Sequence, residues 1–280
     1  MSNGEVRLPG GLTLRALVPN AITASALGFG LTGIRFAITA ASGQAEVPAQ
    51  SGLPLDDWQK AVLAVILAGV LDGIDGRIAR LLKAQSRFGA ELDSLSDCIS
   101  FGVAPALILF LWSLQDLPRL GWFACLAFAI CCALRLARFN ARIDLVEQPH
   151  KSAGYLTGVP APVGAGLAFL PMYLWIATGL PQFREPLVVG GWLVVIAFLM
   201  ISNIATWSWG SARPRKAIRL ELLALFALVG TALLSEPWLT LVAICVIYLA
   251  TIPYGVWSYA RVKRQRAARA AAVLPDGPSA

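Results

Sequence analysis

Charged side chains are scarce in this chain: only 14% of its 280 residues are Asp, Glu, Lys or Arg. An average soluble domain carries about 25% charged residues. Hydrophobic residues make up 57% of the sequence, and the mean hydropathy is +0.68. So few charges cannot cover the surface of a soluble domain of this length, and so apolar a composition also excludes an intrinsically disordered chain. The composition therefore predicts a polytopic membrane protein.

Histidine and paired cysteine are also lacking. His150 is the only histidine, which argues against histidine metal sites and Ser-His-Asp triads as the main chemistry. The five cysteines lie in apolar stretches without a CxxC pair. This pattern is typical of buried small hydrophobic residues in a reduced protein, and it favours neither a zinc site nor a disulfide framework. The first sixteen residues lack the apolar core of a cleavable signal peptide.

Long apolar runs recur along the chain. A membrane-spanning helix needs about 20 residues, and the runs show none of the period-2 alternation of membrane strands. The predicted spans cover residues 19–40, 58–81, 93–114, 119–139, 159–180, 187–208, 217–235 and 238–260. The expected fold is therefore all-α, a polytopic membrane helix bundle with about eight transmembrane helices. In this organisation residues 1–18 form an amphipathic interfacial lead-in, residues 19–260 the transmembrane domain, and residues 261–280 a basic cytoplasmic tail that is expected to be disordered.

Basic residues predict the orientation of these spans. With eight spans both termini lie on one side, and all but four of the 23 Lys and Arg residues fall on that side; the exceptions are Arg35, Lys60, Arg119 and Arg184. The positive-inside rule then places both termini in the cytoplasm, with the protein in the inner membrane. Topology thus explains most of the net charge of +7. The basic tail fits attraction to anionic lipid, and nucleic-acid binding is not expected.

Four aspartates gather where one predicted span ends and the next begins. Asp72 and Asp75 are three residues apart and Asp93 and Asp97 are four apart, so each pair shares a helix face. The loop between the spans is short, which makes the helices antiparallel neighbours and lets the pairs converge. Four carboxylates at the inner edge of a bilayer repel one another and are costly to ionise. A bound cation is therefore expected between them.

An all-oxygen ligand set favours a hard cation, Mg²⁺ or Mn²⁺, over zinc or copper. Four aspartates can hold two such ions, and a metal pair suits a phosphoryl or pyrophosphate group. Gly76 and Ala79 follow Asp72 at helical spacing and clear a strip for a bulky ligand, while Arg80 is placed to meet a phosphate. A single aspartate at a membrane boundary is more simply explained as solvated. The combination of four aspartates, two glycines and an arginine within 26 residues argues for a site.

The spacing Asp72-x2-Asp75-Gly76-x2-Ala79-Arg80-x8-Gly89-x3-Asp93-x3-Asp97 matches the signature of the CDP-alcohol phosphotransferases without a departure. The chain resembles this family over most of its length. The resemblance implies a helix bundle with a six-helix core that transfers a phosphatidyl group from a CDP-activated lipid to an alcohol, releases CMP and uses a divalent metal. It also implies the metal ligands Asp72, Asp75, Asp93 and Asp97, a general base in Asp97, and a CDP-lipid site lined by Asp72, Gly76, Ala79, Arg80, Ser86 and Gly89.

Three further stretches are similar to the bacterial phosphatidylserine synthase branch of this family: Gln85–Leu107, Ala133–Asn140 and Gly158–Gly166. Pro19-Asn20 with Thr23 resembles the start of the family's first core helix. The branch implies CDP-diacylglycerol and L-serine as substrates and CMP as a product, and the family implies a homodimer in the membrane lipid.

Arg135, Arg138 and Asn140 end the fourth predicted span on the side of the aspartates. A serine carboxylate or a lipid phosphate is a plausible partner for either arginine. Alternatively, the arginines are ordinary positive-inside charges that orient the spans. The family resemblance favours contact with the substrate.

Two other functions stay open. The core motif does not exclude choline, inositol phosphate or glycerol phosphate as the acceptor. A membrane transporter is the alternative from a different class, because intramembrane charge is common there. The aspartates cluster at one edge, however, and no second copy of the motif is found.

Overall fold

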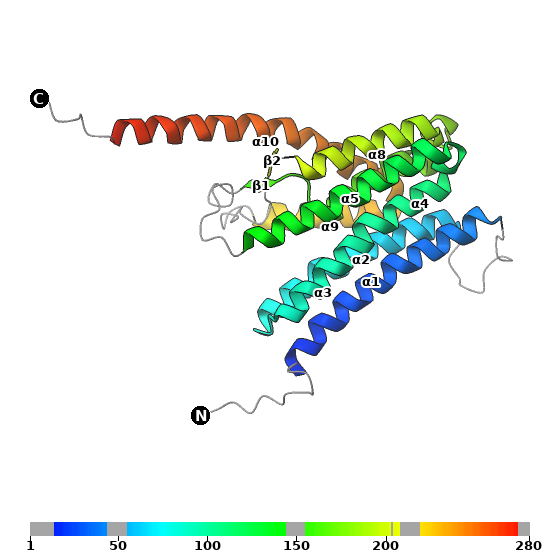
Figure 1. Cartoon of the computed structure of the whole chain (residues 1–280), viewed down its shortest axis with the longest axis horizontal. Helices are drawn as coiled ribbons and strands as arrows, with labels where there is room; N and C mark the ends of the chain where they lie inside the picture. The colour runs from blue at the N-terminus through cyan, green and yellow to red at the C-terminus, as the bar shows by residue number, and fades with distance from the viewer. Residues whose placement is uncertain (1–13, 44–54, 144–154, 203, 208–218, 274–280) are drawn as a thin grey trace, which may run out of the picture. The chain divides into compact units, whose positions relative to one another are not determined.

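The computed structural model describes residues 14–43, 55–143, 155–202, 204–207 and 219–273 (Figure 1). The chain divides into two compact units. The first unit consists of Met1–Ile143 and Pro160–Ile201, and the second of Asp144–Val159 and Ser202–Ala280. All candidate site residues fall in the first unit.

The first unit is built from helices, and one helical stretch changes from an α-helix to a π-helix and back. In chain order the elements are α1 (Leu14–Ala41), α2 (Asp57–Leu81), α3 (Arg87–Asp97), the π-helix η1 (Cys98–Val103), α4 (Ala104–Trp112), the 3₁₀ turn η2 (Leu114–Asp116), α5 (Pro118–Ile143), α6 (Ala161–Ala168), α7 (Leu170–Thr178), the 3₁₀ turn η4 (Pro181–Arg184) and α8 (Pro186–Ile201). α3, η1 and α4 form one continuous apolar stretch, so a π-helical segment follows directly after Asp97. π-helical turns inside α-helices are frequent at functional sites.

Five helical stretches of the described residues are long and apolar enough to cross a membrane. They are Leu17–Ala41, Arg87–Trp112, Pro118–Ala141, Ala161–Thr178 and Pro237–Gly255. Two further apolar helices are shorter, Pro186–Ile201 and Leu223–Ser235. The remaining predicted span forms α2, whose 25 residues include the charged positions around Asp72 and Asp75. The expected all-α membrane bundle is therefore confirmed.

Close approach of α1 to its neighbours depends on two glycines. α1 and α2 lie side by side (Figure 1). A Cβ on Gly33 would lie 2.9 Å from the carbonyl oxygen of Ala61 in α2. A Cβ on Gly30 would lie 2.6 Å from the Ser100 hydroxyl in η1. Small residues of this kind let membrane helices pack backbone against backbone.

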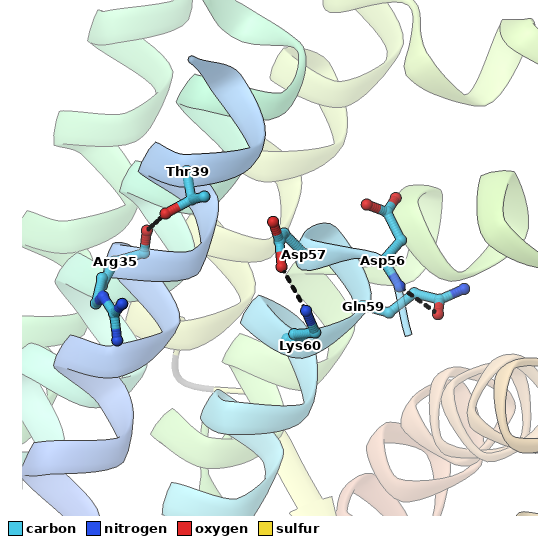
Figure 2. A network of polar contacts seen from close by, with 6 residues as sticks. All are labelled: Arg35, Thr39, Asp56, Asp57, Gln59 and Lys60. Carbon is cyan, nitrogen blue, oxygen red and sulfur yellow. Dashed lines mark hydrogen bonds and ion pairs between the residues drawn. The ribbon is translucent and has the colours of Figure 1, made fainter. Parts of the chain in front are cut away.

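The end of α2 that lies away from the aspartates carries its own polar contacts (Figure 2). The Asp56 amide donates to Gln59 Oε1 at 3.2 Å, which satisfies a main-chain donor at the start of α2. Lys60 Nζ lies 2.7 Å from Asp57 Oδ1 and 5.8 Å from the ring centroid of Phe36. The first two contacts lie within the start of α2, and the contact between Lys60 and Phe36 joins this end of α2 to α1.

In the part that the structure describes, the second unit contains two short strands and two helices. β1 (Tyr155–Thr157) and β2 (Ala205–Trp207) pair antiparallel, with Leu156 opposite Thr206. α9 (Arg219–Ser235) precedes α10 (Pro237–Val273), and α10 contacts both α9 and β2.

Three boundaries differ from the sequence expectations. The span expected at 187–208 ends as a helix at Ile201, and residues 205–207 form β2 because they pair with β1. Residues 261–273, expected as part of a disordered tail, continue α10, where alanine, arginine and glutamine are good helix formers. Residues 14–18, assigned to the lead-in, already belong to α1; residues 1–13 and 274–280 lie outside the described residues.

Candidate active site

Three aspartates from two helices converge at one end of the first unit. Asp72 and Asp75 of α2 and Asp93 of α3 each offer a carboxylate oxygen, and these oxygens all lie within 4.8 Å of one another. Asp75 is buried, with 4% of its surface exposed, and Asp72 and Asp93 are half-buried. The convergence predicted from the spacing is therefore present for these three residues.

Asp97 lies beside this cluster. Its side chain lies close to that of Asp72, and it interacts electrostatically with Asp72, with Asp93 and with Arg135 of α5. Its Oδ1 atom is buried and has no hydrogen-bond partner among the described residues. Buried polar atoms of this kind are rare in native proteins and call for an explanation such as an ion or a catalytic role.

The donor set fits a divalent metal ion. All four groups are carboxylates, the ligands that hard cations prefer. Two oxygens bound to one Mg²⁺ at ~2.1 Å lie at most about 4.2 Å apart. The oxygens of Asp72, Asp75 and Asp93 lie within 4.8 Å, so small side-chain movements would close them on an ion. An ion would also offset the repulsion between the acids.

A hydroxyl from α1 reaches the same cluster. Thr23 Oγ1 donates to Asp75 Oδ2 at 2.5 Å, and both side chains are buried. The Ser96 hydroxyl of α3 donates to the main-chain oxygen of Thr23 at 3.3 Å. α1 therefore contacts both of the helices that carry the aspartates.

The positions expected to line a CDP-lipid site differ in their surroundings. A Cβ on Gly76 would meet no described atom of another element within 4 Å, so this face of α2 is open. Ala79 is half-buried and Arg80 is exposed one turn further along. The backbone of α2 is thus accessible where the motif has its small residues. Nothing in these surroundings obstructs a bulky ligand at Gly76.

Ser86 and Gly89 have local structural roles at the start of α3. Ser86 is the N-cap, and its hydroxyl accepts a hydrogen bond from the Gly89 amide at 3.0 Å. A Cβ on Gly89 would lie 2.9 Å from Asn20 Oδ1 of α1. Glycine at this position therefore lets α1 and α3 approach each other. The cap in turn fixes the helix start that sets the direction of Asp93 and Asp97.

The three residues at the end of α5 make different contacts. Arg135 interacts with Asp97 and so belongs to the acidic cluster. Arg138 Nη2 donates to the main-chain oxygen of Ile201, the last residue of α8, at 2.8 Å. Asn140 Nδ2 donates to the Ser94 hydroxyl of α3 at 2.7 Å. The two arginines share a helix face as expected, and Arg135 interacts electrostatically with Asp97 while Arg138 donates a hydrogen bond to α8.

Sequence reasoning assigned no role to Ser94 or Ser96, and it noted Thr23 only as part of the family resemblance. Hydroxyl residues in apolar helices commonly bond a carbonyl one turn earlier in their own helix. Thr32 does so in α1, with its Oγ1 2.6 Å from the main-chain oxygen of Gly28. Spacing alone gave no signal that Thr23 reaches across to another helix.

Comparison with known families matches two family models to this chain. The family model described as CDP-alcohol phosphatidyltransferase matches residues 16–209, and the one described as CDP-alcohol phosphatidyltransferase 2 matches residues 217–253. The first match includes every aspartate of the cluster together with the Thr23 and Arg135 positions. The second covers α9 and the first part of α10.

Curated bacterial relatives carry the name CDP-diacylglycerol–serine O-phosphatidyltransferase. The protein of Mycobacterium tuberculosis strain H37Rv is 36% identical over 265 residues, which cover 91% of this chain and 83% of the relative. The protein of Helicobacter pylori strain J99 is 32% identical over 188 residues, which cover 67% of this chain and 70% of the relative. The protein of Bacillus subtilis strain 168 is 34% identical over 144 residues, which cover 51% of this chain and 72% of the relative. With its apolar helices and its acidic cluster, the chain belongs to the CDP-alcohol phosphatidyltransferases, a family of integral membrane proteins.

Proposed function

We propose that the chain is a phosphatidylserine synthase, which transfers the phosphatidyl group of CDP-diacylglycerol to the hydroxyl of L-serine and releases CMP. The observation that carries this proposal is the likeness to curated relatives of that name over 91% of the chain. The convergence of Asp72, Asp75 and Asp93 supports it independently, because the reaction handles a pyrophosphate and needs a centre that binds divalent metal.

The proposed metal ligands are Asp72, Asp75, Asp93 and Asp97, with Mg²⁺ or Mn²⁺ as the ion and two ions as the expected number. When bound, the ions would neutralise the pyrophosphate and stabilise the charge that develops on the departing CMP. Asp75 is already held by Thr23 Oγ1. This hydrogen bond limits the movement of the Asp75 carboxylate before any ion binds.

Asp97 is the proposed general base. Its buried Oδ1 lacks a hydrogen-bond partner among the described residues, so it is available to accept a proton. The serine hydroxyl would give its proton to Asp97 while its oxygen forms a bond to the lipid-side phosphorus. The bond between that phosphorus and the bridging oxygen breaks, and this oxygen leaves with CMP. Arg135, next to Asp97, is the proposed partner of the serine carboxylate or the lipid phosphate.

The CDP-lipid site is proposed along the open face of α2. Gly76 and Ala79 would let the nucleotide approach the backbone, and Arg80 would meet a phosphate. Asp72 contributes from the preceding turn, and Ser86 and Gly89 shape the start of α3. Arg138 and Asn140 would support this site by holding α5 to α8 and α3.

We propose that the protein lies in the inner membrane with both termini and the site facing the cytoplasm. The basic residues support this orientation, because all but four lie on the side of the termini in the eight-span arrangement. Serine and CMP would then exchange with the cytoplasm while the lipid tails stay in the bilayer. The homodimer remains a proposal from the family resemblance.

The test is to incubate the purified protein with CDP-diacylglycerol, Mg²⁺ or Mn²⁺ and one acceptor at a time: L-serine, choline, inositol phosphate or glycerol phosphate. We expect release of CMP with phosphatidylserine as the product when serine is present. Faster release with another acceptor would identify a different CDP-alcohol transferase. A lack of metal-dependent CMP release with every acceptor would contradict the enzyme assignment and favour a transporter.

A further inference from the structure

The contact between Thr23 and Asp75 joins the first helix of the chain to the acidic cluster. Thr23 Oγ1 donates to Asp75 Oδ2 at 2.5 Å across 52 positions of sequence. The two residues are 5% and 4% exposed, so water does not compete for this hydrogen bond. Among the described side chains of the cluster, Asp75 is the most buried. Thr23 donates a side-chain hydrogen bond to it, and the Gly76 backbone amide interacts with the same carboxylate.

The hydroxyl of Thr23 has a second possible acceptor. Its Oγ1 lies 3.1 Å from the main-chain oxygen of Pro19 in its own helix. A hydroxyl has one proton to donate, and a carboxylate is the stronger acceptor because the hydrogen bond is then charge-assisted. The distances agree with this preference. Ser25 and Thr32, by contrast, bond carbonyl oxygens of α1 itself, Ala21 at 2.8 Å and Gly28 at 2.6 Å.

The backbone of Thr23 is fixed from the other side of the site. The Ser96 hydroxyl, next to Asp97 in α3, donates to the Thr23 main-chain oxygen at 3.3 Å, and Ser96 is only 3% exposed. Thr23 therefore bonds α2 through its side chain and α3 through its backbone. These are the two helices whose carboxylates must be held at the spacing of one metal centre.

We propose that Thr23 is a positioning residue for the metal centre: its hydroxyl occupies Asp75 Oδ2 and so leaves the other oxygen of that carboxylate for the ion. This inference rests on the proposed metal-binding role of Asp75. Hydrogen-bond partners of metal ligands typically change metal affinity by 10–100-fold when they are lost. An effect of that size is expected here because Thr23 and Asp75 are both buried.

The experiment measures Mn²⁺ binding to the full-length protein in lipid nanodiscs without substrate, by the electron paramagnetic resonance signal of free Mn²⁺. Thr23→Val removes the hydroxyl and keeps the shape of the side chain, and we expect Mn²⁺ affinity to fall by about 10–100-fold. Thr23→Ser keeps the hydroxyl and should bind Mn²⁺ within about threefold of the original protein. Thr32→Val makes the same chemical change on α1 at a hydroxyl that bonds its own helix, and it should leave Mn²⁺ affinity unchanged.

The outcomes distinguish a failure of this inference from a failure of the metal assignment on which it rests. If the original protein binds Mn²⁺ and Asp75→Asn weakens that binding, the metal role of Asp75 holds. Unchanged affinity in Thr23→Val would then overturn the positioning role alone, and so would a loss in Thr23→Ser as large as in Thr23→Val. If the original protein binds no Mn²⁺, or Asp75→Asn binds it equally well, the metal assignment and this inference are both wrong. Melting temperatures identify any variant that is unfolded, and Thr23→Ala then replaces Thr23→Val.

Discussion

Arg138 donates from Nη2 to the main-chain oxygen of Ile201 at 2.8 Å and so ties the end of α5 to the end of α8. A cation at the last carbonyls of a helix also interacts favourably with the helix dipole. Arg135, one turn earlier on α5, instead interacts with Asp97. Two arginines that look equivalent in the sequence therefore have different surroundings, which predicts different consequences when each is removed.

Replacing each arginine by methionine should separate the two roles. Arg135→Met should lower kcat/KM by about 10–100-fold, because the proposed hydrogen bond from Arg135 to the serine carboxylate or the lipid phosphate would contribute about 1.5–3 kcal/mol. Arg138→Met should lower the melting temperature and change kcat/KM by less than about fivefold. Arg119→Met, an exposed residue at the other end of α5, serves as the control. The assignment is wrong if Arg138→Met has the larger effect on kcat/KM.

Asp97→Asn tests the general base with almost no change in shape. The amide cannot accept the serine proton, so kcat should fall by about 10²–10⁴-fold while the protein stays folded. The measurement is CMP release at saturating serine and CDP-diacylglycerol, together with the melting temperature. Asp116→Asn, at an exposed position in η2, is the matched control and should keep full activity. Normal turnover by folded Asp97→Asn protein would exclude this role for Asp97.

Replacement of glycine by alanine should affect the melting temperature differently at Gly76 and at Gly30. A Cβ on Gly76 meets open space, and alanine is favoured over glycine in a helix by about 1 kcal/mol. Gly76→Ala should therefore leave the melting temperature equal or slightly higher, but raise KM for CDP-diacylglycerol, because the methyl group occupies the approach of the nucleotide. Gly30→Ala would place its Cβ 2.6 Å from Ser100 Oγ and should lower the melting temperature.

Gly73→Ala is the control for that comparison, since Gly73 is exposed and equally unobstructed but is not part of the motif. It should change neither the melting temperature nor KM by much. If Gly76→Ala also leaves KM unchanged, the nucleotide does not approach this face of α2.

The periodicity of the sequence was enough to predict the aspartate cluster, because residues close together in the sequence determine its geometry. Spacings of three and four residues fix a helix face, and a short loop forces the two helices together. Helix limits were less predictable, because they depend on which backbone groups pair outside the helix. The stretch after Ile201 mixes polar and apolar residues, and residues 205–207 pair with β1. Residues 261–273 are charged enough to suggest disorder, yet they are good helix formers and extend α10.

Contacts between distant helices were beyond sequence reasoning. Thr23 reaches Asp75 because α1 packs closely on α2 at Gly33, and this register depends on the shapes of both helices. The contact of Arg138 with Ile201 depends in the same way on how α8 lies against α5. Long side chains of similar position can take different directions, so a shared helix face does not imply a shared partner.

The repulsion within the acidic cluster predicts an unusual effect of Asp93→Asn on stability. Asp93 interacts electrostatically with Asp72 and Asp75, so without an ion its charge destabilises the fold, and with an ion the same charge contributes to binding. Mg²⁺ or Mn²⁺ at 100 times its dissociation constant should stabilise the original protein by about 2.7 kcal/mol. In the presence of EDTA, Asp93→Asn should melt at a higher temperature than the original protein, because one repelling charge is gone.

Added Mg²⁺ or Mn²⁺ should then raise the melting temperature of the original protein but have little effect on Asp93→Asn. Thermal unfolding in nanodiscs with EDTA and with each ion measures both differences, and Glu91→Gln, an exposed acid on the same helix, is the control. A general effect of divalent ions on lipid would stabilise all three proteins alike and would contradict the metal centre. Only an ion held by these carboxylates makes one substitution stabilising in EDTA and removes the response to metal, because the same negative charge causes both effects.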